Sequence, residues 1–200
     1  MARFALMVDT EGVLQATSLK GISAADWQEI QSIGNSNLVP ASTVATLQYS
    51  ITVAMALTVD RSGVLNVYRN DSTDGAGWRL AETVGGATLQ PGGNVVVFRQ
   101  SASMVTALTI DRFGVLNRAS LDSSVSSSWQ GMFTIGGSQL IPGSPIALCI
   151  SDSAVFTAMV VDSAGMLNVA TLDLGAGPDW QGLSTIGGAQ LDPGSAVCLI

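Results

Sequence analysis

The sequence predicts an all-β protein made of one structural unit repeated four times, and three observations lead to this prediction. The four tryptophans, Trp27, Trp78, Trp129 and Trp180, are each separated from the next by 51 residues. A fixed period of this length is typical of repeat architectures. Short β-branched and apolar runs alternate with turn residues, as in strands. No window of 11 residues shows the 3.6-residue period of a helix.

Other residues recur at the same interval without insertion or deletion, so the units share one register. Each unit has an aspartate, a glycine, a leucine and a proline in equivalent positions: Asp9, Asp60, Asp111 and Asp162; Gly12, Gly63, Gly114 and Gly165; Leu14, Leu65, Leu116 and Leu167; Pro40, Pro91, Pro142 and Pro193. A chain of 200 residues is long enough to bury a substantial core. We expect one domain over 1–200, divided into units 1–40 plus 195–200, 41–91, 92–142 and 143–194.

The unit at 143–194 shows the expected order of strands. Ser144–Ile150 follows Pro-Gly and is the first strand, A, and Ala154–Asp162 is the second, B. Asp162–Gly165 forms a turn, because aspartate accepts backbone N–H groups of a turn and glycine permits a positive φ. Gly165–Leu172 is strand C, and Trp180–Ile186 is strand D after a loop rich in glycine and proline. Such strands predict one four-stranded antiparallel sheet per unit.

Strand B indicates how the four sheets pack. Its aligned positions carry an alanine beside a large apolar residue: Ala5 and Leu6, Ala56 and Leu57, Ala107 and Leu108, Ala158 and Met159. Adjacent residues of a strand point to opposite faces, so both faces of strand B are apolar. Each sheet must therefore be covered on both sides. A radial arrangement of sheets, the β-propeller, meets this requirement, and each unit is then one blade.

The ends of the sequence predict how the ring closes. The chain starts at a strand B and ends at Ser195–Ile200, which has the pattern of a strand A. We expect this C-terminal segment to pair with the first blade, which lacks a strand A, and to close a four-bladed ring by covering two free sheet edges. The alternative is an eight-bladed ring in which two chains exchange these strands. A monomer and a homodimer are both compatible with the repeat.

Composition excludes several functions. The 15 acidic residues exceed the 8 basic ones, giving a net charge of −7, and Lys20 is the single lysine, so we expect no nucleic-acid binding. There is no histidine, the commonest general base and metal ligand. Apolar runs such as Val53–Leu57 are too short to cross a membrane. Met1–Val8 is too short for a signal peptide, so we expect cytoplasmic synthesis, with release by a non-classical route left open.

We expect neither a cofactor nor a metal. Cys149 and Cys198 have neither zinc-site nor redox spacing and lie in apolar runs, so free, buried thiols are predicted. The stretch Asn70–Gly75 carries oxygen ligands like those of a calcium loop, but it lacks the closing glutamate.

Three stretches of the unit, Trp129–Gly137, Leu140–Ser144 and Val161–Asn168, recur in the other copies. These motifs resemble those of the propeller lectins typified by the Photorhabdus fucose-binding and Psathyrella velutina lectins, with the Aleuria aurantia lectin as a more distant relative. The resemblance implies multivalent, non-catalytic carbohydrate binding in clefts between adjacent blades, with fucose or N-acetylglucosamine as the expected sugar. The Aleuria-type pattern uses an arginine, a glutamate and a tryptophan at each site. In this chain only two turns between strands B and C carry an arginine, Arg61 and Arg112.

Three sets of residues are candidates for contacting a sugar. The tryptophans Trp27, Trp78, Trp129 and Trp180 can offer an aromatic face, or they can begin strand D and pack against the next blade with the indole N–H bonded to backbone. The amides Gln15, Asn66, Asn117 and Asn168 can bridge hydroxyl groups or can hold the turn between strands B and C. Arg61 and Arg112 form the third set. The loops between strands C and D vary while the strands do not, which is typical of binding loops.

These observations leave three functional hypotheses. The favoured one is a multivalent lectin whose partners are mono- or oligosaccharides. The second is a structural or protein-binding scaffold, natural or designed, without a sugar ligand. The third is a propeller enzyme of the sialidase kind, which needs clustered Arg, Glu and Tyr. The chain has only two tyrosines, Tyr49 and Tyr68, so we expect no enzymatic activity.

Overall fold

The structure is a computed structural model that describes residues 3–20, 23, 26–34, 37–137, 139–152, 154–187 and 190–197. Its strands are β1 (Arg3–Val8), β2 (Leu14–Leu19), β3 (Gln31–Ile33), β4 (Ala45–Gln48), β5 (Val53–Val59), β6 (Leu65–Asp71), β7 (Trp78–Val84), β8 (Val95–Arg99), β9 (Met104–Ile110), β10 (Leu116–Asp122), β11 (Gln130–Gly136), β12 (Ala147–Asp152), β13 (Val155–Val161), β14 (Leu167–Asp173) and β15 (Ser184–Ile186). Within these described residues, no helix is long and apolar enough to span a membrane.

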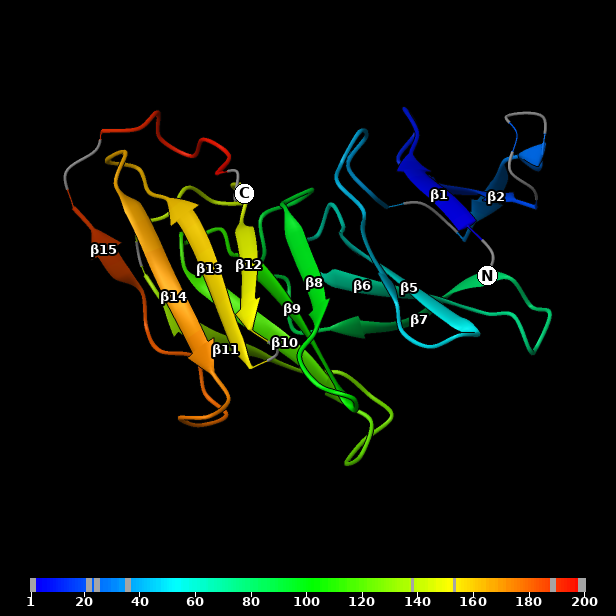
Figure 1. Cartoon of the computed structure of the whole chain (residues 1–200). Helices are drawn as coiled ribbons and strands as arrows, with labels where there is room; N and C mark the ends of the chain where they lie inside the picture. The colour runs from blue at the N-terminus through cyan, green and yellow to red at the C-terminus, as the bar shows by residue number, and fades with distance from the viewer. Residues whose placement is uncertain are drawn as a thin grey trace.

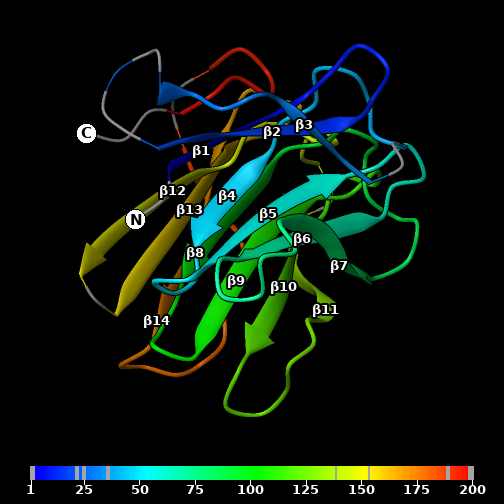
Figure 2. The ribbon, with the colours of Figure 1, turned by 90° about the vertical axis from the view of Figure 1, so that its right-hand side faces the viewer.

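The strands form four antiparallel sheets, which confirms the predicted fold class. Blade 1 contains β1–β3, blade 2 contains β4–β7, blade 3 contains β8–β11 and blade 4 contains β12–β15. In every sheet each strand is hydrogen-bonded to its neighbours in sequence. The blades follow one another in chain order around an open arc, with blade 1 and blade 4 at its two ends (Figure 1). Figure 2 shows the same arc from the side of blades 1 and 2.

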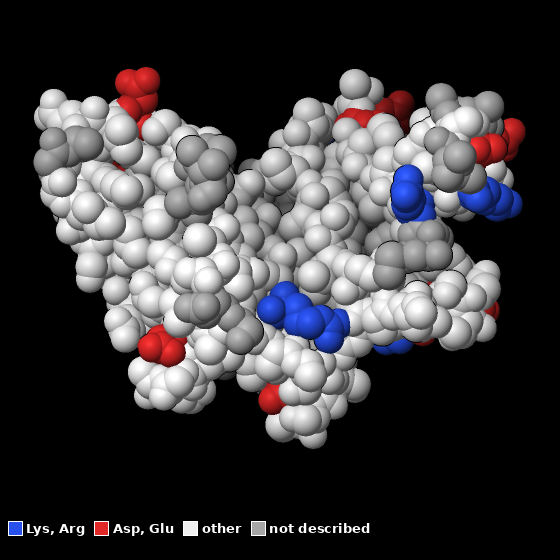
Figure 3. Space-filling view, in the orientation of Figure 1, with Lys and Arg blue, Asp and Glu red and all other residues white. Residues whose placement is uncertain are grey.

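The arc does not close into a ring. Blade 1 has three strands, and the outer edge of β1 pairs with no other strand of the described residues. Ser195–Val197 belongs to no strand, and residues 198–200 lie outside the described residues. Within residues 195–197, the predicted pairing of the C-terminal segment with blade 1 is therefore not formed. Figure 3 shows a deep notch between the two ends of the arc. Four blades therefore span only part of a circle, and the fourth blade does not return to the first.

Packing between blades buries both faces of the central strands, as strand B predicts. Every residue of β5 is buried, and Ala56, Ala107 and Ala158 are inaccessible or nearly so. One apolar cluster joins Leu57 of blade 2 to Val105 of blade 3, and comparable clusters join blade 1 to blade 2 and blade 3 to blade 4. Removing apolar surface from water contributes about 25 cal/mol per Å² to the free energy of folding, so these clusters are the main source of stability.

The turn between strands B and C is held by its aspartate. Asp111 Oδ1 accepts the backbone N–H groups of Phe113 at 2.9 Å and Val115 at 3.0 Å. The equivalent carboxylates make the same pair of bonds: Asp9, Asp60 and Asp162. One carboxylate oxygen thus fixes two backbone groups that would otherwise lack partners.

These hydrogen bonds lower the pKa of two turn aspartates. The backbone N–H of Val13 and the amide of Gln15 hold the pKa of Asp9 below its ordinary value. For Asp162, burial raises the pKa, but the hydrogen bonds from the Met166 N–H and the Asn168 amide outweigh burial, and the pKa is lowered.

A glycine in the same turn lets one leucine connect neighbouring blades. Gly114 has a φ of +74°, and a Cβ at this position would lie 2.3 Å from the Leu140 carbonyl oxygen. The Leu140 N–H donates to the Gly114 carbonyl at 3.2 Å, and Leu140 also forms a β-bridge with Asp162 of blade 4. Leu38 and Leu89 make the same two connections. We call Leu38, Leu89 and Leu140 the interblade leucines.

Two local predictions need correction. Strand D begins at Trp78 in blade 2, but in blade 4 it begins at Ser184, so the predicted strand Trp180–Ile186 is too long. This strand is the edge of an end blade, and its three residues are exposed, so little packing extends it. The thiol of Cys149 is free but half-buried rather than buried, because β12 is the other edge of that blade. Cys198 lies outside the described residues.

Alanine in place of Gly114 should destabilise the fold more than alanine in place of Gly75. Both glycines have a positive φ, which costs an alanine about 1–2 kcal/mol. A Cβ at Gly75 meets nothing within 4 Å, whereas a Cβ at Gly114 forces backbone to move, a further cost of about 1–3 kcal/mol. Thermal melting followed by circular dichroism compares Gly114→Ala with Gly75→Ala. Equal melting temperatures for the two variants would show that the close approach to Leu140 is unimportant.

The lowered pKa values of Asp9 and Asp162 should make the protein sensitive to acid. A carboxylate whose folded-state pKa lies below the ordinary value of 3.8 stabilises the fold above that value, and the contribution is lost as the pH falls through the folded-state pKa. We expect these groups to leave the melting temperature unchanged between about pH 7 and about pH 5 and to lower it below about pH 4. Asp162→Asn should melt earlier at pH 7 and lose less on acidification. If the melting temperatures of the native protein and of Asp162→Asn fall equally with pH, the lowered pKa of Asp162 is not a cause of the acid sensitivity.

Candidate functional site

A cleft with a volume of about 540 Å³ lies between blades 2 and 3. We call it cleft A. Its walls include Arg69 from β6, the segment Arg79–Glu82 from β7 and Trp129 from blade 3. Serines of the loop between β10 and β11 complete the rim: Ser123, Ser126, Ser127 and Ser128. The cleft therefore combines an apolar floor with charged and hydroxyl groups, which is a typical composition for a small-molecule site.

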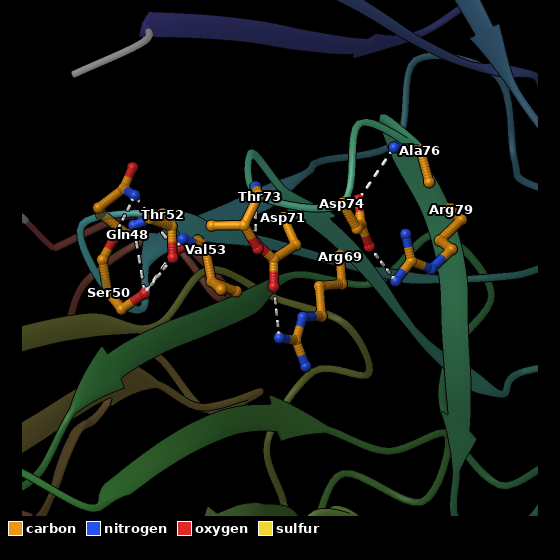
Figure 4. A network of polar contacts seen from close by, with 10 residues as sticks. All are labelled: Gln48, Ser50, Thr52, Val53, Arg69, Asp71, Thr73, Asp74, Ala76 and Arg79. Carbon is orange, nitrogen blue, oxygen red and sulfur yellow. Dashed lines mark hydrogen bonds and ion pairs between the residues drawn. The ribbon is translucent and has the colours of Figure 1, made fainter.

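Two arginines of cleft A are held in place by aspartates. Arg69 and Arg79 are directly opposite each other on β6 and β7, an unfavourable placement for like charges. Arg69 Nη2 lies 2.9 Å from Asp71 Oδ2, and Arg79 Nη2 lies 2.7 Å from Asp74 Oδ2 (Figure 4). The two carboxylates offset the repulsion and fix the direction of both guanidinium groups.

The same contacts keep these ion pairs charged. The Thr73 hydroxyl and backbone N–H, followed by Arg69, lower the pKa of Asp71. Hydrogen bonding to Arg79 and to the Ala76 N–H lowers the pKa of Asp74, and Asp74 in turn raises the pKa of Arg79. Both pairs therefore stay ionised near neutral pH.

A glutamate and a tryptophan meet across the blade interface. The carboxylate of Glu82 accepts the backbone N–H of Trp129, with distances of 3.3 and 3.2 Å to its two oxygens. The indole Nε1 of Trp129 and the Nε of Arg69 are buried and have no hydrogen-bond partner. A buried donor without an acceptor costs free energy. Both atoms are therefore buried donors that the protein leaves without an acceptor.

A β-bulge brings consecutive residues of β7 to the cleft. Val67 is opposite Glu82 and Tyr68 is opposite Leu80, so Ala81 is the extra residue on β7. A bulge bends the strand and changes the direction of neighbouring side chains. Leu80, Ala81 and Glu82 therefore all line the cleft, although they are adjacent in sequence.

A second cleft lies at the equivalent position between blades 1 and 2. We call it cleft B; its volume is about 190 Å³, and its walls include Lys20, Gln28, Gln31, Asn70 and Trp78. A shift of 51 residues relates Gln28 to Arg79, Gln31 to Glu82 and Trp78 to Trp129. Cleft B therefore offers amides where cleft A offers charges.

The third equivalent position, between blades 3 and 4, carries different side chains. Phe133 stands where cleft A has Glu82. Arg118 lies 5.5 Å from the centre of the Phe133 ring and pairs with Asp179 of blade 4 at 3.1 Å. An aromatic ring and an ion pair between blades thus replace the carboxylate of cleft A.

The predicted tryptophans divide into two kinds. Trp129 and Trp180 are buried, with 7% and 9% of their surface exposed, and Trp180 packs edge-on against Phe98 at 6.2 Å. Trp78 is half-buried, and Trp27 is 40% exposed. Trp129 and Trp180 thus pack between blades, which corresponds to the alternative role. The indole N–H groups of Trp78, Trp129 and Trp180 have no hydrogen-bond partner, however, whereas that role predicts a bond to backbone.

The predicted amides lie beside the turn aspartates rather than in clefts A and B. Asn117 Nδ2 donates to Asp111 Oδ2 at 3.0 Å, and Asn117 Oδ1 accepts the Thr134 hydroxyl at 3.2 Å. The other amides donate to their aspartates in the same way: Gln15, Asn66 and Asn168. This geometry corresponds to the alternative in which the amides hold the turn.

Arg61 and Arg112 also lie at the turns, at the opposite end of the strands from cleft A. Arg61 Nε donates to the Leu38 carbonyl at 2.9 Å, and Arg112 stacks on Phe113 at 4.9 Å. The arginines that line cleft A, Arg69 and Arg79, were not predicted, nor was Glu82. Each occurs in only one unit, and the repeat comparison selects residues shared by all units. The sequence signal that could have identified these residues is a charged side chain that occurs in one unit only, at a position near the tryptophan.

Among the described residues, no group of three or more His, Cys, Asp or Glu side chains is arranged so that it could hold a metal ion.

Comparison with known proteins shows that the fold is similar to that of solved propeller lectins. No family model and no curated protein sequence matches the chain. Among solved structures, it is similar to the BP39L lectin from Burkholderia pseudomallei, with a TM-score of 0.83 and 23% identity over 98% of this chain and 55% of the other. The SapL1 lectin, solved with alpha methyl fucoside, gives a TM-score of 0.66 and 15% identity over 98% of this chain and 63% of the other.

The lectin of the fungus Aleuria aurantia, described as a six-bladed β-propeller with a novel fucose recognition mode, gives a TM-score of 0.61 and 14% identity over 92% of this chain and 53% of the other. The chain thus spans between about half and two thirds of the length of these proteins. Its four sheets correspond to an arc of a β-propeller.

Proposed function

We propose that this protein is a non-catalytic lectin and that cleft A is its principal sugar-binding site. The observation that carries the proposal is the meeting of Arg69, Glu82 and Trp129 across one blade interface. An arginine, a glutamate and a tryptophan are the residue types that the resemblance to Aleuria-type lectins implies. Here they come from two adjacent blades, as that resemblance also implies.

The chemistry of cleft A suits a monosaccharide. Arginine donates in a fixed planar fork and a carboxylate accepts, so together they match neighbouring hydroxyl groups of a sugar ring. Leu80, which is exposed, offers apolar surface to the C–H face of a ring. We take fucose as the first candidate, because the SapL1 and Aleuria lectin structures are described with fucoside or fucose, and N-acetylglucosamine as the second.

The number of working sites follows from the three interfaces. Cleft A has the charged set, cleft B has an amide and lysine set, and at the third position Arg118 lies against Phe133, without a carboxylate equivalent to Glu82. We therefore expect one stronger and one weaker site per chain in place of four equivalent sites. Two or more weak sites on one protein molecule or assembly still give strong attachment to a surface that displays many sugars.

Substitution of Glu82 by alanine should weaken fucoside binding. A hydrogen bond to a charged group is worth about 1.5–3 kcal/mol, which corresponds to about a 10- to 100-fold loss of affinity. Isothermal titration calorimetry with alpha methyl fucoside, and separately with N-acetylglucosamine, measures the affinity and the number of sites. The matched control is Thr83→Ala, an exposed residue of the same strand that does not line the cleft.

Two results would contradict the proposal. If the native protein binds no sugar on a glycan array, the lectin assignment fails and the scaffold hypothesis gains. If Glu82→Ala and Thr83→Ala bind equally well while both keep the native circular dichroism spectrum, then cleft A is not the principal site.

A further inference from the structure

The two blades at the ends of the arc each leave one face uncovered. In blade 1, Leu6 and Val8 pack toward blade 2, so Ala5 and Met7 point away from it. In blade 4, Ala158 and Val160 pack toward blade 3, so Met159 points away from it. We call these surfaces end face 1, which includes Ala5, Met7 and Trp27, and end face 4, which includes Thr157, Met159, Leu167, Val169 and Leu191.

Burial patterns show that these faces are incomplete interfaces. Every residue of β5 in blade 2 is buried, whereas in β13 of blade 4 Val155, Thr157 and Met159 are only half-buried. The interblade leucines are 1–5% exposed, but Leu191, the equivalent residue of blade 4, is 38% exposed. Trp27 of blade 1 is likewise far more exposed than Trp129. Leucine and tryptophan positions that are buried between blades are thus more exposed at the ends of the arc.

The repeat itself shows what would cover them. At each existing interface, the interblade leucine forms a β-bridge with the turn aspartate of the next blade. The backbone N–H after that aspartate also donates to the previous blade: Arg61 to Asn37 at 2.7 Å, Arg112 to Thr88 at 3.1 Å and Ser163 to Gln139 at 2.9 Å. The fourth set would be Leu191 with Asp9 and the Thr10 N–H with Gln190. These residues lie at opposite ends of the arc, and the bonds are not formed among the described residues.

We infer that end face 4 of one chain packs on end face 1 of a second copy, in the same register that joins blades within the chain. A single chain does not bring its own two faces together, because the notch in Figure 3 separates them. Two copies related by a twofold axis use both faces of both chains and leave none exposed. The product is a ring of eight blades, which lies within the range of about 4–8 blades seen in propellers.

The interface also gives Trp27 the environment of its equivalents. Packing against the strands of a neighbouring blade is what buries Trp129 and Trp180. The named residues of end face 4 carry no charge, so covering them requires no desolvation of an ionic group. The inference is independent of the proposed sugar site, because cleft A lies wholly between blades 2 and 3 of one chain.

Light scattering coupled to size-exclusion chromatography tests this arrangement on the full chain. We expect a mass of twice 20.5 kDa for the native protein. Met159→Glu and Met7→Glu place a charge on end face 4 and end face 1, and each should give 20.5 kDa with an unchanged circular dichroism spectrum. The matched control is Val125→Glu, an 83% exposed apolar residue of blade 3 outside both faces, which should remain a dimer.

Mixing the two variants reports how the faces pair. Met7→Glu keeps an intact end face 4, and Met159→Glu keeps an intact end face 1, so an equimolar mixture should recover dimers joined by a single contact. A measurement that needs no variant is hydrogen exchange at the Thr10 amide, which should be slower at dimer-forming concentration than after dilution. A native mass of 20.5 kDa at every protein concentration measured, or a Met7→Glu variant that stays dimeric by itself, would overturn the inference.

Discussion

The contact on which the architecture depends is the one between a turn glycine, an interblade leucine and the next turn aspartate. The absence of a side chain at Gly114 lets the Leu140 backbone approach, and the β-bridge from Leu140 to Asp162 then sets the register of the next blade. Because the same three residue types recur in each unit, every blade is placed relative to the previous one by backbone geometry. The apolar clusters between blades supply stability, whereas this contact supplies position.

Much of the fold could be predicted because it depends on residues that the four units share. The 51-residue period, the apolar residues on both sides of Ala56 and the Asp-x-x-Gly turns led to four antiparallel sheets packed face to face. Closure could not be predicted in the same way. It depends on the angle between blades, which arises from many side-chain volumes, and the sequence pattern contains no direct record of that angle.

The candidate site was largely missed for the opposite reason. Residues that recur, such as Asn117 and Arg112, serve the turns, where every blade has the same structural need. The residues that make cleft A chemically distinct, Arg69, Arg79 and Glu82, occur in a single unit. In a repeat protein, the shared positions report on construction, and the departures from the shared pattern report on what each interface is free to do.

The bulge at Ala81 has a consequence for how such a protein can change. The residue that follows it projects into the space between blades without taking part in the packing of the central strands. The four units carry Gln31, Glu82, Phe133 and Ser184 there, so the observed interfaces present an amide, a carboxylate or an aromatic ring at this position. The residue at this position can therefore change at one interface without altering the packing of the other blades, so that the ligand preference of each interface can diverge separately.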